Sequence, residues 1–410
     1  MRISTLSIYS NATNQLNSLQ SALARTQAQL STDRRMLTPA DDPVASARAL
    51  EVSQAKEMNA QFATNRSSAH SSLAMVESKL QNAGSLLQDI QEMAVKAGNA
   101  TMLPSDRQAL ATELEGRLQD LMGVANSTDG SGGYLFSGFK TTTQPFNASA
   151  TGADYNGDQG QRQLQVGDAR KMPLSVSGSA VFENNPTGNG TFQTQAGKDN
   201  QGAAIISSGS VVDRNQAEAG RKYKLSFEVS GTPAVTTYSV VDTTTTGSEV
   251  PVPGQTGITY EPGKAITFGG LSFDIKGAPA NGDNFTAEPS KKQSVFATVT
   301  DLVAALRAPA DGSAGKAALS NKLNTALDNL KSSHDNVLTV QASVGAHMKE
   351  LEYLDSAGDD LDIQYSATLN DLQELDKVKA ISDFAAQQTT LQAAQMSFKT
   401  MSGLSLFNYL

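Results

Sequence analysis

Apolar residues recur three and four positions apart at both ends of this chain, and that spacing constrains the fold more than any other feature. Near the start, the repeating positions are Tyr9, Ala12, Leu16, Leu19, Leu23, Thr26 and Leu30. The spacing is that of a heptad seam between packed helices, with Asn, Gln and Ser on the other face. An amphipathic helix in an ordinary globular domain gives the same pattern, so both interpretations remain open from this stretch alone.

Two proline-containing dipeptides separate this helix from a longer one. The first helix must stop before Thr38-Pro39, because the residue before a proline disfavours helical geometry. Asp42 is a good N-cap, and Pro43 fits the first helical position, where its missing N–H costs nothing. The second heptad run then consists of Leu73, Val76, Leu80, Ala83, Leu87, Ile90, Ala94 and Ala97. A periodic run of this length exceeds that of a typical globular helix and predicts a coiled coil or rod.

The middle of the chain, from about Lys140 to Glu288, is rich in Gly, Thr, Asn and Ser. Alternating apolar residues predict strands at 222–229 and 235–241. Gly269-Gly270, between two further alternating runs, predicts a hairpin. We therefore expect an antiparallel β domain inserted between two helical arms.

Helices are expected on both sides of this β-rich segment. On its amino-terminal side, Ser105 is expected to cap a third helix, with Gln108 in the capping-box position. On its carboxyl-terminal side, helix resumes near Ser294 and stops at Pro309, and two further helices follow.

The final helix also carries an apolar stripe, and the chain ends in the apolar segment Leu404 to Leu410. A large exposed apolar patch marks an interaction surface. The helices at the two ends must therefore bury their stripes against each other and against neighbours. The predicted assembly interface consists of Leu16, Leu19, Leu23, Leu30, Ile381, Phe384, Leu391, Phe398, Met401 and Leu410.

The predicted fold class is α+β: a long helical coiled-coil or bundle rod built from both chain ends, with an inserted antiparallel β domain. Three domains are expected, namely a terminal coiled coil (1–42 with 368–410), a helical rod (43–139 with 290–367) and the β domain (140–289). Each buried heptad leucine contributes about 1.5–3 kcal/mol, whereas ordering one residue costs about 1–2 kcal/mol in backbone entropy. We therefore expect the terminal pair to be disordered in the monomer and to fold when neighbours cover it.

Composition excludes several classes of function. The chain has no cysteine, which excludes disulfides, thiol catalysis and cysteine-ligated metals. A net charge of −9 argues against nucleic acid as a partner. The first residues lack the apolar run of a secretory signal peptide, and no segment is apolar for the roughly 18 residues that membrane insertion needs.

Residues that could carry chemistry are few and scattered. His347 and Glu350 lie three apart, but no second ligand cluster accompanies them. Asp154-x-Asn-x-Asp158 fails the EF-hand pattern, because Gln159 and Gln165 stand where Gly and Glu are required. We therefore predict no catalytic, cofactor-binding or metal-binding residues and no enzyme activity, although a carboxylate hydrolase in the β region is not ruled out by the residues.

Five stretches resemble the third hook-associated proteins of bacterial flagella, the distal hook–filament junction proteins of the flagellin superfamily. They are Met1-Arg-Ile-Ser-Thr; Pro39-Ala-Asp-Asp-Pro-Val-Ala45; Gly133-Tyr-Leu-Phe-Ser-Gly-Phe-Lys-Thr141 with Pro145-Phe146; Tyr155-Asn-Gly-Asp-Gln-Gly160 with Arg162 and Val166-Gly167; and Gly282-Asp-Asn-Phe285 with Gln293-Ser-Val-Phe296. The last thirty residues also resemble the terminal helix of this superfamily. The segment from about 184 to 262 resembles it only in its general composition and its short alternating runs. Among these motifs, Phe136, Phe139 and Phe146 are expected to plug the base of the β domain.

The resemblance implies an extracellular structural subunit of the flagellum and no cofactor. Its implied partners are further copies in a ring, the first hook-associated junction protein, flagellin, and an export chaperone that binds the carboxyl-terminal helices. It also implies export through the flagellar type III channel. The alternatives are filament flagellin and a type III secreted translocator-like helical protein.

Overall fold

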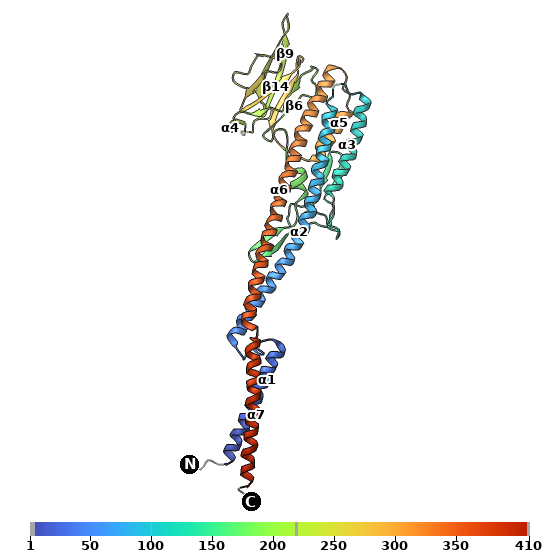
Figure 1. Ribbon diagram of the computed structural model, residues 1–410. Helices are drawn as coiled ribbons and strands as arrows, with labels where there is room; N and C mark the ends of the chain where they lie inside the picture. The colour runs from blue at the N-terminus through green and yellow to red at the C-terminus, as the bar shows by residue number, and fades with distance from the viewer. Residues whose placement is uncertain (1–4, 100, 218–219, 408–410) are drawn as a thin grey trace. The chain divides into compact units, whose positions relative to one another are not determined.

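The computed structural model describes residues 5–99, 101–217 and 220–407. Contacts divide the chain into two compact units, Met1–Arg66 with Tyr353–Leu410, and Ser67–Glu352. Two long helices, α2 (Pro43–Ala97) and α6 (Gly312–Gln373), contribute to both units (Figure 1). The predicted α+β class, with long helices from both ends of the chain and antiparallel strands in the middle, is confirmed.

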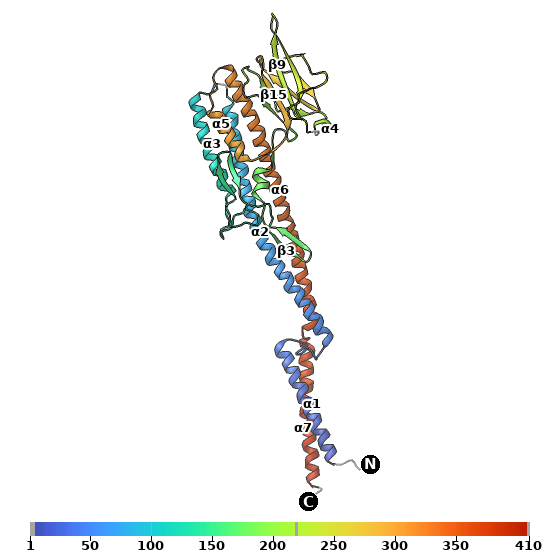
Figure 2. The same cartoon turned by 180° about the vertical axis from the view of Figure 1, so that it is seen from behind.

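The first unit contains α1 (Thr5–Thr32) and α7 (Lys377–Phe407), together with the adjoining parts of α2 and α6. Figures 1 and 2 show α1 and α7 side by side, with the two chain termini at the same end of the pair. The predicted cap of α2 is confirmed, since the Ala45 N–H donates to Asp42 Oδ1 at 3.0 Å. Asp376 acts in the same way before α7, where its Oδ1 accepts from the Lys379 N–H at 3.0 Å.

The second unit has a helical part and a β part. In the helical part, α3 (Pro104–Ala125) packs against α5 (Val295–Arg307). The predicted heptad residues of α2 are all buried, with 0–2% exposure. They are Leu73, Val76, Leu80, Ala83, Leu87, Ile90, Ala94 and Ala97. Helix resumes near Ser294 as predicted, and Ser294 caps α5, with its Oγ accepting from the Phe296 N–H at 3.2 Å.

The expectation that Ser105 caps α3 is wrong. Leu103 occupies the N-cap position and makes no side-chain cap, and Pro104 is the first helical residue. The physical reason is the backbone preference of proline, whose fixed φ suits the first turn and whose missing N–H leaves one fewer donor to satisfy.

The strands of the β part form antiparallel pairs throughout. Two hairpins come first: β1 (Phe146–Ser149) with β2 (Gly152–Tyr155), and β3 (Gln163–Gly167) with β4 (Arg170–Pro173). A short π-helix, η1 (Ser179–Glu183), follows, and β5 (Asn185–Pro186) then pairs with β16 (Lys292–Gln293).

Two larger sheets follow. A six-stranded sheet has the order β11-β10-β9-β15-β6, with β12 also pairing β10, and a four-stranded sheet has the order β13-β14-β7, with β8 also pairing β14. Their strands are β6 (Phe192–Ala196), β7 (Ile205–Ile206), β8 (Ser210–Val211), β9 (Tyr223–Ser230), β10 (Val235–Asp242), β11 (Val250–Pro251), β12 (Ile258–Thr259), β13 (Ala265–Phe268), β14 (Leu271–Lys276) and β15 (Asn284–Pro289). A short helix, α4 (Arg214–Ala217), precedes β9. The predicted strands at 222–229 and 235–241 are β9 and β10, and the Gly269-Gly270 hairpin joins β13 to β14.

A compact aromatic cluster joins the first hairpin to α5. Phe146 packs edge-on against Phe182, with ring centroids 5.6 Å apart, and its centroid lies 5.0 Å from that of Phe296. Phe136 packs edge-on against Phe182 at 5.5 Å. The prediction that Phe139 joins this plug is wrong, because its side chain is 64% exposed. Its backbone N–H donates instead to Asp158 Oδ1, so the turn holds the chain while the ring stays outside.

Among the described residues, no helix is both long enough and apolar enough to cross a membrane. The three-part division with boundaries near 42, 139, 289 and 367 stays a prediction.

Candidate assembly interface

The helices α1 and α7 meet along the seam that the heptad spacing predicts. The rings of Tyr9 and Phe398 lie 4.8 Å apart, centroid to centroid. Near the other end of the pair, the Thr26 hydroxyl lies 3.0 Å from Gln387 Oε1 and donates to it. Aromatic contact at one end and a polar contact at the other therefore define how the two helices face each other.

Of the predicted interface residues, Leu16, Phe398 and Met401 lie between the two helices, and none of those that the structure describes is fully buried. Leu16, Leu19, Leu23 and Leu30 of α1 are half-buried, as are Phe384, Leu391 and Phe398 of α7. Ile381 is 58% exposed and Met401 is 44% exposed. Leu410 lies outside the described residues. The two helices therefore cover each other on one side only.

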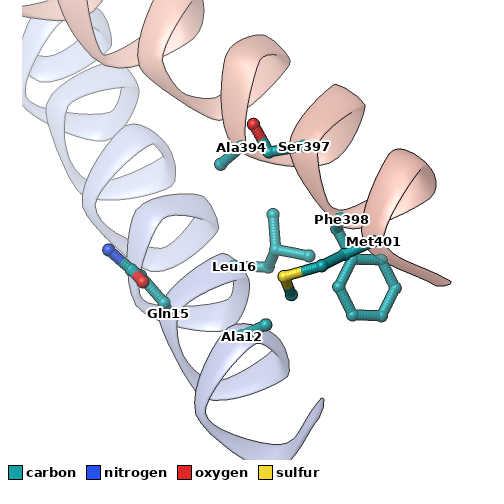
Figure 3. A pocket seen from close by; sticks show the side chains of 7 residues that line it. All are labelled: Ala12, Gln15, Leu16, Ala394, Ser397, Phe398 and Met401. Carbon is teal, nitrogen blue, oxygen red and sulfur yellow. The ribbon is translucent and has the colours of Figure 1, made fainter. Parts of the chain in front are cut away.

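A groove opens between the two helices near their ends. Its lining consists of Ala12, Gln15, Leu16, Ala394, Ser397, Phe398 and Met401 (Figure 3). In Figure 3, Leu16 of α1 points toward Phe398 and Met401 of α7, and the small side chains of Ala12 and Ala394 leave room beside them. The apolar floor of this groove is a surface that another apolar side chain can fill.

A set of polar contacts, called the polar joint here, connects the segment that follows α1 to the break between α6 and α7. The Arg35 N–H donates to the Gln373 carbonyl at 2.8 Å, and the Arg35 guanidinium donates to the Leu372 carbonyl at 2.9 Å. Lys377 Nζ lies 2.8 Å from Asp33 Oδ2. Asp33 has φ of 56°, a left-handed conformation that is unusual for a residue other than glycine. The heptad pattern missed this joint, because its residues lie at helix ends or between helices, where no periodicity marks them.

Asp41 stabilises the same joint from within the connecting segment. The N–H groups of Thr38 and Leu37 donate to Asp41 Oδ2 at 2.9 and 2.8 Å, and these bonds hold the pKa of its carboxyl below the usual value. Arg25 lies 2.8 Å from the other carboxylate oxygen. Asp41 belongs to the Pro-Ala-Asp-Asp-Pro motif, so that motif has a clear structural role in shaping the break between α1 and α2.

The other quoted motifs also meet in space. Asp158 accepts hydrogen bonds from the backbone N–H groups of Phe139, Lys140 and Gly160. The Tyr155 hydroxyl donates to the carbonyls of Phe136 and Asp158, and burial raises its pKa to about 12. The Tyr-Leu-Phe-Ser-Gly and Tyr-Asn-Gly-Asp motifs therefore bind each other and build the turn from helix to sheet.

No cluster of three or more His, Cys, Asp or Glu side chains able to hold a metal ion is found in the described ranges. Glu350, considered above with His347, is engaged elsewhere, since Arg170 Nη2 lies 2.6 Å from its Oε2. The carboxylate of Asp158, considered as a calcium ligand, is occupied by the three backbone donors.

Comparisons with known proteins agree on one family. Residues 3–141 match the family described as the bacterial flagellin N-terminal helical region. Flagellar hook-associated protein 3 of Salmonella typhimurium is 29% identical over 411 residues, covering 99% of both chains. The crystal structure of the flagellar junction protein FlgL from Legionella pneumophila is 32% identical, covers 80% of this chain and 100% of that one, and superposes with a TM-score of 0.72.

A second solved structure gives the same result. FlgL from Xanthomonas campestris is 30% identical, covers 78% of this chain and 99% of that one, and superposes with a TM-score of 0.68. The likeness thus extends over nearly the full length of each relative and includes both the helices and the β part. The chain therefore belongs to the family of flagellar hook-associated protein 3, the FlgL proteins.

Proposed function

We propose that this chain is a structural subunit of the hook–filament junction of the bacterial flagellum, forming a ring that adapts the hook to the flagellin filament. The observation that carries the proposal is the half-covered apolar seam of α1 and α7, with Leu16, Leu391 and Phe398 half-buried and Ile381 58% exposed. The printed names of the relatives, hook-associated protein 3 and junction protein, support it.

A half-buried seam gains stability when a neighbouring copy covers it. Fully burying a leucine-sized side chain contributes about 1.5–3 kcal/mol, so covering a half-exposed one contributes about half of that. The seam carries many such residues, and the groove between Leu16 and Phe398 can accept a further apolar side chain. A neighbouring copy in the ring that covers this surface would bury these side chains and stabilise the helix pair.

The proposed partners follow from a place between hook and filament. They are neighbouring copies in the ring, the first hook-associated protein on one side, flagellin on the other, and an export chaperone that binds the carboxyl-terminal helices before assembly. The chain would leave the cell through the flagellar type III apparatus and act outside it. The absence of cysteine suits passage as an unfolded chain, because no disulfide needs to be reduced.

Filament flagellin is the less favoured alternative. The likeness to hook-associated protein 3 extends over 99% of both chains. The family is a structural one, and we propose no catalytic role for any residue of this chain.

Deletion of the gene, followed by electron microscopy of the cells, tests the proposal. We expect hooks without filaments and flagellin in the medium, both reversed when the intact gene is returned. Filaments of normal length on the deletion strain would contradict it. Seeding of the purified protein with sheared filaments separates the two roles, since a junction subunit should add at most one layer whereas flagellin should keep extending.

A further inference from the structure

One hydrophobic core of the β part is formed by residues of that part alone. Its buried members all lie between Phe192 and Ala287, and none comes from α6. The helix α6 nevertheless runs alongside this part of the second unit (Figures 1 and 2). The polar contacts between α6 and this part therefore bear on how the β part is held on that helix.

Three asparagines on α6 make that connection. Asn321 accepts from the Ile206 N–H at 2.9 Å and donates to the Ala204 carbonyl at 3.0 Å. An amide side chain that accepts from one residue and donates to the residue two before it reproduces the hydrogen bonds of a neighbouring strand. Asn321 therefore pairs with β7 as an additional strand would.

The second asparagine holds a turn. Asn329 Oδ1 accepts from the Gly188 N–H at 2.9 Å, and Asn329 Nδ2 donates to Gln293 Oε1 at 3.3 Å. Gly188 has φ of 63°, and a Cβ there would lie 2.3 Å from the Phe192 carbonyl oxygen, so the turn admits only glycine. Asn329 is 5% exposed, so its amide has no water to compete for these bonds.

The third asparagine holds the π-helix η1. Asn336 Nδ2 lies within 3.0 Å of the carbonyls of Ala180 and Val181, and 2.9 Å from Asn185 Oδ1. Asn185 is 2% exposed, and its own Nδ2 donates to the carbonyls of Phe182 and Gln293. The amides of Asn336, Asn185 and Asn329 are thereby linked through Gln293.

The spacing makes the three contacts act together. Asn321 and Asn336 are fifteen residues apart, which at about 1.5 Å per residue places the contacts over roughly 22 Å of helix. They reach residues 204–206 at β7, the turn at Gly188 that leads into β6, and the π-helix η1 that precedes β5. Three attachments over that length fix both the position and the tilt of the β part, which a single contact would not.

We propose that Asn321, Asn329 and Asn336 form an amide latch that fixes the β part in one pose on α6, although they add nothing to its hydrophobic core. Asn321 and Asn329 are buried and Asn336 is half-buried, and such amides favour a single geometry, because every other pose leaves them and their backbone partners without hydrogen bonds. The latch is independent of the proposed assembly role, since it lies within residues 67–352.

The absence of cysteine allows a direct test, because two introduced cysteines can be labelled without side reactions. Spin labels at Ala318→Cys on α6 and Thr246→Cys in the β part, both exposed positions, report the distance between the two parts by double electron–electron resonance. The same pair is measured in the full chain carrying Asn321→Ala, Asn329→Ala and Asn336→Ala together. The matched control is Asn370→Ala, an exposed asparagine on the same helix.

We expect one narrow distance distribution in the parent chain and in the control, and a distribution at least twice as wide in the triple variant. Amide exchange of β9 and β10 should remain slow in all three proteins, because their core does not include α6. An unchanged narrow distribution in the triple variant would overturn the proposal. Loss of slow exchange in β9 and β10 would overturn it as well, since the amides would then hold the core itself and not its pose.

Discussion

The ring of Tyr9 lies 4.8 Å from the ring of Phe398, so the two ends of a 410-residue chain meet in one helix pair. This contact between α1 and α7 still leaves the apolar face of each helix about half exposed. A neighbouring copy can cover the remaining surface, and the assembly proposed for this chain depends on that step.

The first prediction concerns Leu391, which is half-buried on the seam of α7. Leu391→Asp should cost the monomer about 1 kcal/mol or less, because the side chain is already partly solvated. The main thermal transition of residues 67–352 should stay unchanged. In an assembled seam the same aspartate would be an unpaired buried charge, which costs several kcal/mol. Differential scanning calorimetry and sedimentation of the assembled protein measure the two effects.

Leu80→Asp is the matched control for this substitution. Leu80 is fully buried in the second unit, so the same change should cost about 3 kcal/mol or more and lower the melting temperature sharply. A Leu391 variant that melts as early as the Leu80 variant would show that the seam belongs to the stable core of the monomer.

The second prediction concerns the aromatic cluster at the base of the first hairpin. Phe182 is fully buried against Phe136 and Phe146, so Phe182→Ala should cost about 3–5 kcal/mol. Phe139→Ala should change stability by less than about 0.5 kcal/mol, because that ring is 64% exposed. Urea unfolding monitored by circular dichroism compares the two, and equal losses would contradict this account of the cluster.

The third prediction concerns Asp328 of α6, whose pKa is raised above 3.8, chiefly by burial. A raised carboxyl pKa means that the folded chain binds the proton more tightly than the unfolded chain. Stability is therefore highest below pH 3.8 as far as this group is concerned, and it falls as the pH rises through the raised pKa. Asp328→Asn should remove that fall and raise the melting temperature at pH 7. A variant that melts lower than the parent at pH 7, with the same pH slope, would count against this reading.

The fourth prediction concerns Asp41, whose pKa is lowered by the N–H groups of Thr38 and Leu37. A lowered carboxyl pKa gives stability that is fully present above pH 3.8 and is lost as the pH falls through the lowered value. The amide resonance of Thr38 should therefore shift only below pH 3.8. Asp41→Asn should abolish the shift. A Thr38 midpoint at or above pH 3.8 in the parent chain would show that these hydrogen bonds do not form in solution.

Periodicity made the helices predictable. The heptad positions from Leu73 to Ala97 are all buried, and Asp42 caps α2 as its position before Pro43 suggests. Alternation likewise located β9, β10 and the β13–β14 hairpin. In each case the local sequence repeats the signal several times, so that one misplaced residue does not change the outcome.

Features that depend on contacts distant in sequence could not be predicted. Phe139 stands in the same motif as Phe136, and nothing local distinguishes the buried ring from the exposed one. Asn321, Asn329 and Asn336 are spaced eight and seven apart on α6, where polar residues are ordinary on a solvated face. Only the fold reveals that their partners are backbone groups more than a hundred residues away.

We propose that the seam of α1 and α7 joins copies of this chain at the hook–filament junction. The most direct measurement is electron microscopy of a deletion strain that expresses the Leu391→Asp chain, together with an immunoblot of the medium. We predict hooks without filaments, with both the variant and flagellin present in the medium. Cells that carry normal filaments and swim as the parent does would contradict the claim.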